Sequence, residues 1–178
     1  MIILVEINKS NSTYKEIRNR HYVTNRGCIG RQIHYLIFDS EEFGTRPIGV
    51  ISGASPVWAC KPRDQYFGIT KENRVHKLDE IINNTVFRLE KTVKNLASQT
   101  LALWRKQITK DWYGKYGFKI KGFETFIFGE NRTGGIYKAD NWKFVGITQG
   151  SKFRSRIRRY TNNTPIRSGE QKKLIFCK

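Results

Sequence analysis

Hydrophobic runs along the chain predict a set of β-strands. Residues 1–7 form an apolar run that is typical of a buried strand. A second β-rich run at 31–38 predicts a central strand, and residues 48–52 return as its hairpin partner across the turn residues of 42–47. Two later runs, 80–89 and 119–128, are rich in β-forming residues and predict two further strands.

Apolar residues at helical spacing predict one long helix in the middle of the chain. The residues on this row are Leu96, Leu101, Leu103, Trp104, Ile108, Trp112 and Tyr116. Asn95 is a suitable N-cap, and Gly114 or Gly117 is a suitable stop. A shorter helix, to about Arg20, is predicted from a capping box in which Thr13 is the N-cap and Glu16 reaches back to it.

The remaining segments complete an α/β (α+β) pattern. We expect an irregular loop or short turn at 56–65, a helical or irregular segment at 73–79, a helical turn at 136–142 and a final strand at 143–148. Strands before and after a long helix form a right-handed crossover onto a mixed central sheet flanked by helices. This element order is the one found in acetyltransferases of the GNAT type.

The balance of charge points to a polyanionic partner. The 178 residues contain 33 Lys and Arg against 15 Asp and Glu, a formal net charge of +18. An excess of this size on a small domain attracts nucleic acid electrostatically. A charge that serves solubility, or a place beside the ribosome, is the alternative explanation.

Much of the positive charge lies near the end of the chain. Residues 143–178 hold ten basic side chains and a single acid, Glu170. Within this stretch, Arg154, Arg156 and Arg158 would share one face of an extended segment and grip phosphates. The basic candidates for this contact are Lys152, Arg154, Arg156, Arg158 and Arg159. A disordered basic tail is the alternative.

Length and composition exclude several classes of protein. The chain fits one domain, with residues 1–150 as a GNAT-like catalytic body and 151–178 as its basic C-terminal extension. The three cysteines, Cys28, Cys60 and Cys177, form no CxxC pair and predict no zinc finger. No apolar run approaches the roughly 18 residues that span a membrane. Because no signal peptide is recognised, we expect a cytoplasmic protein with reduced thiols.

Several short segments, taken together, resemble a known family. They are His21-Tyr22, Gly30 to Phe38, Ile81 to Asn84, Asn95 to Ser98, Glu124 to Phe126, and Gly134-Gly-Ile-Tyr-Lys-Ala-Asp-Asn-Trp142. In order and spacing, over about residues 18–150, they resemble the Mom family of phage DNA-modification proteins. They also resemble its relative, the uncharacterised domain of Druantia-type phage-defence proteins.

The resemblance implies a GNAT-like fold and a DNA-modifying activity. The Mom branch implies transfer of a glycinamide-derived (carbamoylmethyl) group to N6 of adenine in double-stranded DNA. The mark hides phage DNA from restriction enzymes, and a phage-encoded protein would act in the host cytoplasm. The donor is left open between acyl-CoA and a charged tRNA such as glycyl-tRNA, and the family is associated with a proposed iron site.

The same resemblance implies a set of catalytic residues. It places a tyrosine after the first helix at Tyr22, beside His21, and a second tyrosine at Tyr137. Glu124 is the first candidate for the acid and Glu130 the second. These groups suit proton transfer to or from the weakly nucleophilic adenine N6, and oxygen and imidazole donors also suit iron. Alternatively, the tyrosines are half-buried structural residues and Glu124 pairs with a lysine or arginine.

Two further groups of residues are candidates for binding. The connection 90–95 lacks the glycines that usually cradle a coenzyme A pyrophosphate, so an anion would be held by Lys91, Lys94, Asn95, Ser98 and the helix N-terminus. An ordinary connection with exposed lysines is the alternative. The candidates for DNA contact in the body of the domain are Arg31, Asn84, Asp140, Asn141 and Trp142, of which Trp142 is equally a core residue. A non-catalytic nucleic-acid-binding module of a defence or mobile-element system is the rival function.

Overall fold

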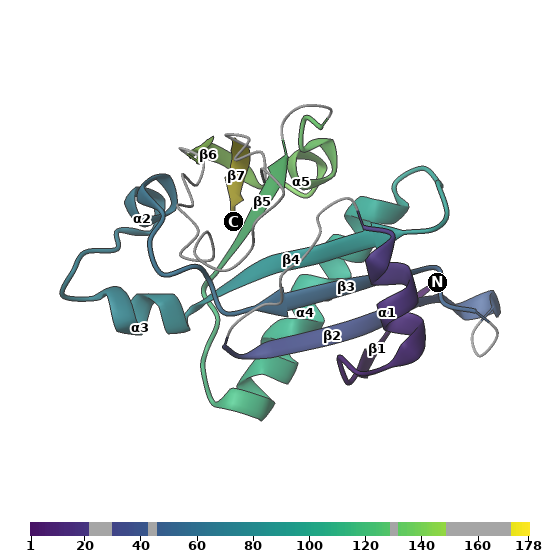
Figure 1. The fold of residues 1–178 in the computed structure, drawn as a ribbon. Coiled ribbons are helices and arrows are strands. Elements are labelled where there is room, and N and C mark those ends of the chain that lie inside the picture. Colours follow the sequence, from purple (N-terminus) through teal and green to yellow (C-terminus); the bar gives the residue numbers. More distant parts are fainter. Residues whose placement is uncertain (22–29, 43–45, 129–131, 149–171) are drawn as a thin grey trace, which may run out of the picture.

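The computed structural model describes residues 1–21, 30–42, 46–128, 132–148 and 172–178, which form a seven-stranded sheet in the order β1-β2-β3-β4-β5-β7-β6 (Figure 1). The strands are β1 (Ile2–Ile7), β2 (Gln32–Asp39), β3 (Gly49–Ala54), β4 (Ile81–Leu89), β5 (Gly122–Phe128), β6 (Lys143–Ile147) and β7 (Lys173–Cys177). The helices are α1 (Ser12–Asn19), α2 (Lys61–Phe67), α3 (Arg74–Asp79), α4 (Leu96–Tyr116) and α5 (Gly135–Ala139), and a 3-10 turn, η1, spans Ser40–Glu42. Only β4 and β5 pair in parallel, so the predicted mixed sheet is confirmed.

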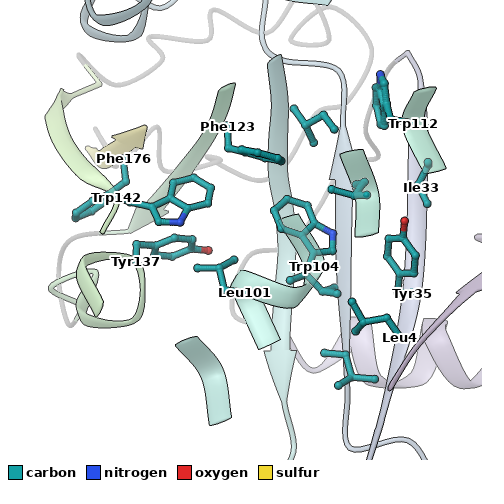
Figure 2. Close-up of a cluster of buried hydrophobic side chains, with 14 of the residues drawn as sticks. Leu4, Ile33, Tyr35, Leu101, Trp104, Trp112, Phe123, Tyr137, Trp142 and Phe176 are labelled. Atoms are coloured by element: carbon teal, nitrogen blue, oxygen red, sulfur yellow. The ribbon is translucent and has the colours of Figure 1, made fainter. Parts of the chain in front are cut away.

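Helices cover both faces of the sheet. The long helix α4 packs on one face, where Leu101, Trp104 and Ile108 are fully buried. Figure 2 shows the first two of these side chains in the core. Helix α1 covers the opposite face with Tyr14 and Ile17 (Figure 1). A β-carbon on Gly53 would lie 2.4 Å from Ile108 Cδ1, so the glycine in β3 lets α4 approach the sheet closely. None of the described helices has both the length and the apolar character required to cross a bilayer.

Two helix starts differ from those expected from the sequence. Helix α1 is capped by Asn11, whose side chain accepts the Tyr14 backbone N–H at 2.9 Å, so the prediction of Thr13 as N-cap is wrong. The expected irregular segment at 56–65 contains the start of helix α2. Pro62 in the first turn and Gly68, at φ +62° just past the end, are local signals in the sequence for the start and the end of α2.

Strand β7 is also absent from the prediction, which made 143–148 the last strand. Residues 173–177 instead insert between β5 and β6, and Ile175, Phe176 and Cys177 are fully buried. The apolar run of β7 is short and has lysines on both sides, so the sequence pattern does not distinguish it from the basic C-terminal extension. The arginine-rich segment itself, including Lys152, Arg154, Arg156, Arg158 and Arg159, lies outside the described residues.

A buried polar cluster joins α1 to the sheet. The Tyr14 hydroxyl lies 2.7 Å from Ser52 Oγ and 3.0 Å from His34 Nδ1, and Ser52 Oγ lies 2.9 Å from the same nitrogen. His34 Nε2 is buried without a hydrogen-bond partner. Burial, and then the positive charges of Arg18, Lys9 and Lys115, lower the pKa of His34 to about 4. The imidazole is therefore neutral in the folded protein at neutral pH.

His34 is expected to make the fold sensitive to acid. Because its folded pKa is about 4 and its unfolded value is 6.5, its contribution is fully present above pH 6.5 and is lost as the pH falls towards 4. Integrated over that window, the loss amounts to about 3 kcal/mol of unfolding free energy. Urea denaturation from pH 7.5 to 4 should show a shallower pH dependence in His34→Gln. The exposed His76→Gln variant is the control, and equal slopes in wild type and His34→Gln would contradict the assignment.

Candidate functional site

The parallel strands β4 and β5 are paired over only part of their length. The ladder joins Ile81–Asn84 of β4 to 122–125 of β5, although β4 continues to Leu89 and β5 to Phe128. Strand β4 carries an extra residue at the end of the ladder, because Gly53 lies opposite Asn84 whereas Ser52 lies opposite Val86. This bulge leaves Thr85 without a cross-strand partner on β3, and the Thr85 hydroxyl is buried without a hydrogen bond.

Tyr137 places its hydroxyl at the last pair of this ladder. It donates to Asn84 Oδ1 at 2.8 Å and lies 3.3 Å from Thr125 Oγ1, and the Thr125 hydroxyl donates to the Asn84 carbonyl. The Tyr137 ring packs edge-on against Trp142 and stacks with Phe176 (Figure 2). With 5% of its surface exposed, Tyr137 is held in one orientation at the point where the strands stop pairing.

Glu124 lies on the other face of β5. Side chains alternate along a strand, so Thr125 meets Tyr137 of α5 whereas Glu124 meets Arg63 of α2. The Glu124 carboxylate is fully buried, forms an ion pair with Arg63 Nη1 and accepts the Val57 N–H at 3.2 Å. Burial raises the pKa of Glu124, and the Arg63 guanidinium opposes this rise. The ion pair left open as an alternative by the sequence is therefore observed.

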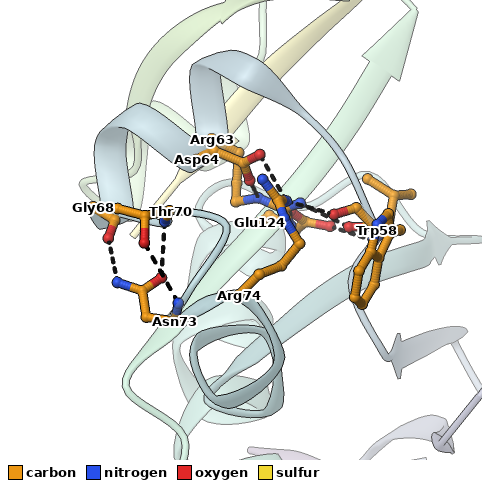
Figure 3. Close-up of polar contacts among 9 residues, drawn as sticks. Trp58, Arg63, Asp64, Gly68, Thr70, Asn73, Arg74 and Glu124 are labelled. Carbon is orange, nitrogen blue, oxygen red and sulfur yellow. Dashed lines mark hydrogen bonds and ion pairs between the residues drawn. The ribbon is translucent and has the colours of Figure 1, made fainter.

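The Glu124–Arg63 pair is the centre of a larger network that sequence analysis missed (Figure 3). Arg63 Nε donates to Asp64 at 2.7 Å, and Asp64 accepts Arg74 Nη1 at 2.9 Å. Arg74 also donates to the Trp58 carbonyl and lies 5.8 Å from the Trp58 ring centroid. No local pattern points to this network, because Arg63 and Glu124 are 61 positions apart.

The residues expected to hold iron are not brought together in the described part of the chain. Tyr22 and Glu130 lie outside the described residues. His21 follows α1, and α1 covers the face of the sheet to which Glu124 points. Tyr137 lies on the opposite face of the sheet. Among the described residues, no group of three or more His, Cys, Asp and Glu side chains is arranged to hold a metal ion. The donor set that the structure describes does not fit an iron site.

A family model described as Druantia protein DruA matches residues 2–165. The chain belongs to the DruA family. This match confirms the resemblance to Druantia-type proteins that is seen in the sequence. It does not extend that confirmation to the Mom family. No curated protein matches the chain.

Solved structures show the fold of this DruA-family chain to be of the GNAT type. The ribosomal-protein-S18-alanine N-acetyltransferase from Escherichia coli superposes with a TM-score of 0.57 at 7% identity, covering 99% of this chain and 92% of that one. Arabidopsis thaliana Naa50, in complex with a bisubstrate analogue that contains CoA, gives 0.55 at 10%, covering 99% and 97%. The aminoglycoside acetyltransferase AAC(6')-Ib, in complex with coenzyme A, gives 0.55 at 10%, covering 100% and 94%. The expected GNAT-like fold is confirmed.

In this DruA-family chain, most of the residues expected to read DNA bases instead make contacts within the domain. Asp140 accepts two hydrogen bonds of 2.7 Å from Arg105 and one of 2.8 Å from the Trp142 indole. Trp142 is 3% exposed and belongs to the core, the second of its two expected roles. Asn84 is buried under Tyr137, and Asn141 adopts a positive φ of 59° directly after α5. Arg31 pairs with Asp79 at 2.7 Å and covers the Phe118 ring.

The expected donor-binding residues lie at the start of α4. Asn95 is at the N-cap position with φ 63°, but its side chain forms no capping hydrogen bond. The Ser98 hydroxyl donates to the Asn95 carbonyl, and Lys94 is exposed in the same connection as the partly exposed Lys91. An uncapped helix N-terminus beside two lysines favours a bound anion. Because the connection follows β4, the anion would lie beyond the end of the β4–β5 ladder.

Proposed function

We propose that this DruA-family chain is a GNAT-type group transferase that acts on nucleic acid, with Tyr137 at the reacting centre. The observation that carries the proposal is the position of the Tyr137 hydroxyl at the last β4–β5 pair, next to the bulge at Thr85. The orphaned Thr85 hydroxyl and the uncapped start of α4 fit a donor that runs along the unpaired part of the strands. The net charge of +18 supports a polyanionic acceptor.

The donor we propose is an acyl-CoA or another phosphate-bearing carrier, as in the solved structures that contain coenzyme A. Lys91, Lys94 and the α4 N-terminus would hold its phosphates, and Ser98 would remain part of the first turn. When bound, such a donor supplies an activated group and a leaving group that needs a proton. Tyr137 Oη holds a proton at that place, so we assign Tyr137 the role of acid.

The acceptor we propose is N6 of adenine in double-stranded DNA. The transferred acyl group bonds to N6 as its bond to the donor's leaving group breaks, N6 loses a proton, and the leaving group takes a proton from Tyr137. A glycyl group transferred in this way gives an N6-acyl isomer of the N6-carbamoylmethyladenine that the Mom resemblance implies. The Glu124 carboxylate is already bound to Arg63 and Val57, so we assign it to holding the fold of the site and not to proton transfer. Asn84 is the positioning residue, because its side chain accepts the Tyr137 hydroxyl. The DruA match is consistent with a role in phage defence.

A binding module without catalysis is the second candidate, and one observation favours it. Tyr137, Glu124 and Asp140 all have internal partners, as they would in a fold whose site has decayed. The two candidates differ in one result, because only the transferase leaves a modified nucleoside in DNA.

The transferase is tested by mass spectrometry of nucleosides in DNA from cells that express the protein. We expect a mass-shifted deoxyadenosine with wild type, and a loss of roughly 10²- to 10⁴-fold in Tyr137→Phe, which removes a proton donor and almost no volume. Tyr22→Phe is measured beside it because the Mom resemblance implies the same role. The exposed Tyr113→Phe on α4 is the control. DNA without a new nucleoside, or unchanged modification in Tyr137→Phe, would remove the assignment.

The stability of each variant separates chemistry from folding. A structural hydroxyl is worth about 1 kcal/mol of unfolding free energy and little rate. An activity loss that tracks the melting temperature across the variants would assign Tyr137 to the fold alone.

A further inference from the structure

Trp58 is exposed, unlike the other three tryptophans of the chain. Its side chain is 64% exposed, whereas Trp104, Trp112 and Trp142 are at 3% or below. Val57 beside it is also exposed, at 42%. Two adjacent apolar side chains on the surface of a highly charged protein point to a contact surface for a partner.

The backbone beneath these two side chains is fixed by buried charges (Figure 3). Val57 donates its N–H to Glu124 at 3.2 Å, and its carbonyl accepts Arg63 Nη2 at 2.7 Å. The Trp58 carbonyl accepts Arg74 Nη1 at 2.8 Å, and the Arg74 guanidinium lies near the Trp58 ring. Arg63 and Glu124 are both fully buried, so the segment is attached to the interior of the domain.

Burying charged side chains costs free energy, so the buried ion pair of Arg63 and Glu124 beneath Val57 calls for an explanation. An ion pair taken out of water gives little net stability compared with apolar residues of the same volume. Here the pair fixes the backbone that presents Val57 and Trp58 to solvent. A segment whose backbone is already fixed before the partner arrives loses less entropy on binding. The geometry therefore fits a prepared contact surface better than an incidental exposed ring.

We propose that Val57 and Trp58 form a platform on which an unpaired base of a nucleic acid stacks, either in a single-stranded segment or extruded from the duplex of the proposed acceptor. Every base has a flat face that stacks on an aromatic ring, and a chain with a net charge of +18 draws in the phosphates that accompany it. Lys61, exposed at the start of α2 three residues further on, is placed to meet such a phosphate. The inference rests on nucleic acid as the partner in the proposed function, and not on the transfer step.

The burial of the other tryptophans makes the platform directly measurable. Fluorescence that changes on binding, and that acrylamide quenches in the free protein, reports mainly on Trp58. We expect a short oligonucleotide with unpaired bases to quench this fluorescence and to protect it from acrylamide. A polyanion without bases, such as heparin, should bind without quenching, because it offers no ring to stack.

Substitution at the same position separates stacking from electrostatics. At fixed salt, Trp58→Ala should weaken binding of the unpaired oligonucleotide by about 5- to 150-fold, the usual effect of losing one stacked base. The salt dependence should be unchanged because no phosphate contact is removed. Trp58→Tyr should retain part of the affinity, and Tyr113→Ala, which removes another exposed aromatic side chain, should retain all of it. Circular dichroism of each variant checks that the fold is kept.

Three outcomes would overturn the platform. Equal affinity of wild type and Trp58→Ala for the unpaired oligonucleotide would leave nucleic acid as partner but assign Trp58 to another surface, such as one for a protein. Quenching by heparin as strong as by the oligonucleotide would show that no base contacts the ring. Failure of wild type to bind any nucleic acid at low salt would remove both the platform and the proposed acceptor.

Discussion

Arg63→Ala is expected to destabilise the protein by about 3–5 kcal/mol, because it leaves the Glu124 carboxylate buried without its charged partner. It also removes the donors to Asp64 and to the Val57 carbonyl. Urea denaturation at pH 7.5 measures the loss. Arg74→Ala is the matched control, because Arg74 lies at the more exposed end of the same network and should cost less.

A double substitution tests whether the loss comes from the pair. Replacing a buried ion pair with apolar residues of similar size is often neutral, so Arg63→Met combined with Glu124→Leu should recover most of the stability lost in Arg63→Ala. If the double variant instead loses the sum of the two single changes, Arg63 and Glu124 are not coupled and the account of this network fails.

Removal of residues 172–178 is expected to prevent folding. This change takes out β7 from between β5 and β6, together with the fully buried Ile175, Phe176 and Cys177. Phe123 also loses both backbone hydrogen bonds to Lys178, of 2.7 and 3.0 Å. Each large apolar side chain removed from a core costs about 2–5 kcal/mol, so the sum consumes the typical 5–15 kcal/mol of a domain. Circular dichroism and the soluble yield measure the result.

The basic segment is tested by substitution instead of deletion, since a deletion that runs to Lys178 removes β7 as well. Changing Arg154, Arg156, Arg158 and Arg159 to Gln should preserve the melting temperature and weaken binding to all DNA sequences alike.

The deletion of residues 172–178 has its own contradicting outcome. A variant without these residues that melts like wild type would show that β7 is dispensable.

The sequence predicts those elements whose own residues carry the pattern. Strands β1 to β5 and helix α4 are recovered because continuous apolar runs and helical spacing are local signals. Strand β7 escapes because its apolar run is short and flanked by lysines, and α2 because it spans only Lys61–Phe67. The GNAT order of elements follows from the local pattern, and the solved structures confirm it.

The site is predictable to a smaller extent because its contacts are long-range. The resemblance alone points to Tyr137, and its partners Asn84 and Thr125 are brought together only by the parallel register of β4 and β5. The partner of Glu124 could be expected to be basic, but nothing local distinguishes Arg63 from the other 32 Lys and Arg residues of the chain. The platform at Trp58 could not be foreseen, because the exposure of a tryptophan depends on what the rest of the chain covers.

The position of β7 also affects the order in which the sheet is completed. Strand β6 is at the edge of the sheet and is joined to it through β7, which follows β6 in the sequence. Among the described strands β6 pairs with β7, so as the chain leaves the ribosome this pairing waits until residues 173–177 have been made. A ribosome that stalls within 149–171 would therefore release an incomplete sheet with β5 as an open edge, a species prone to aggregation.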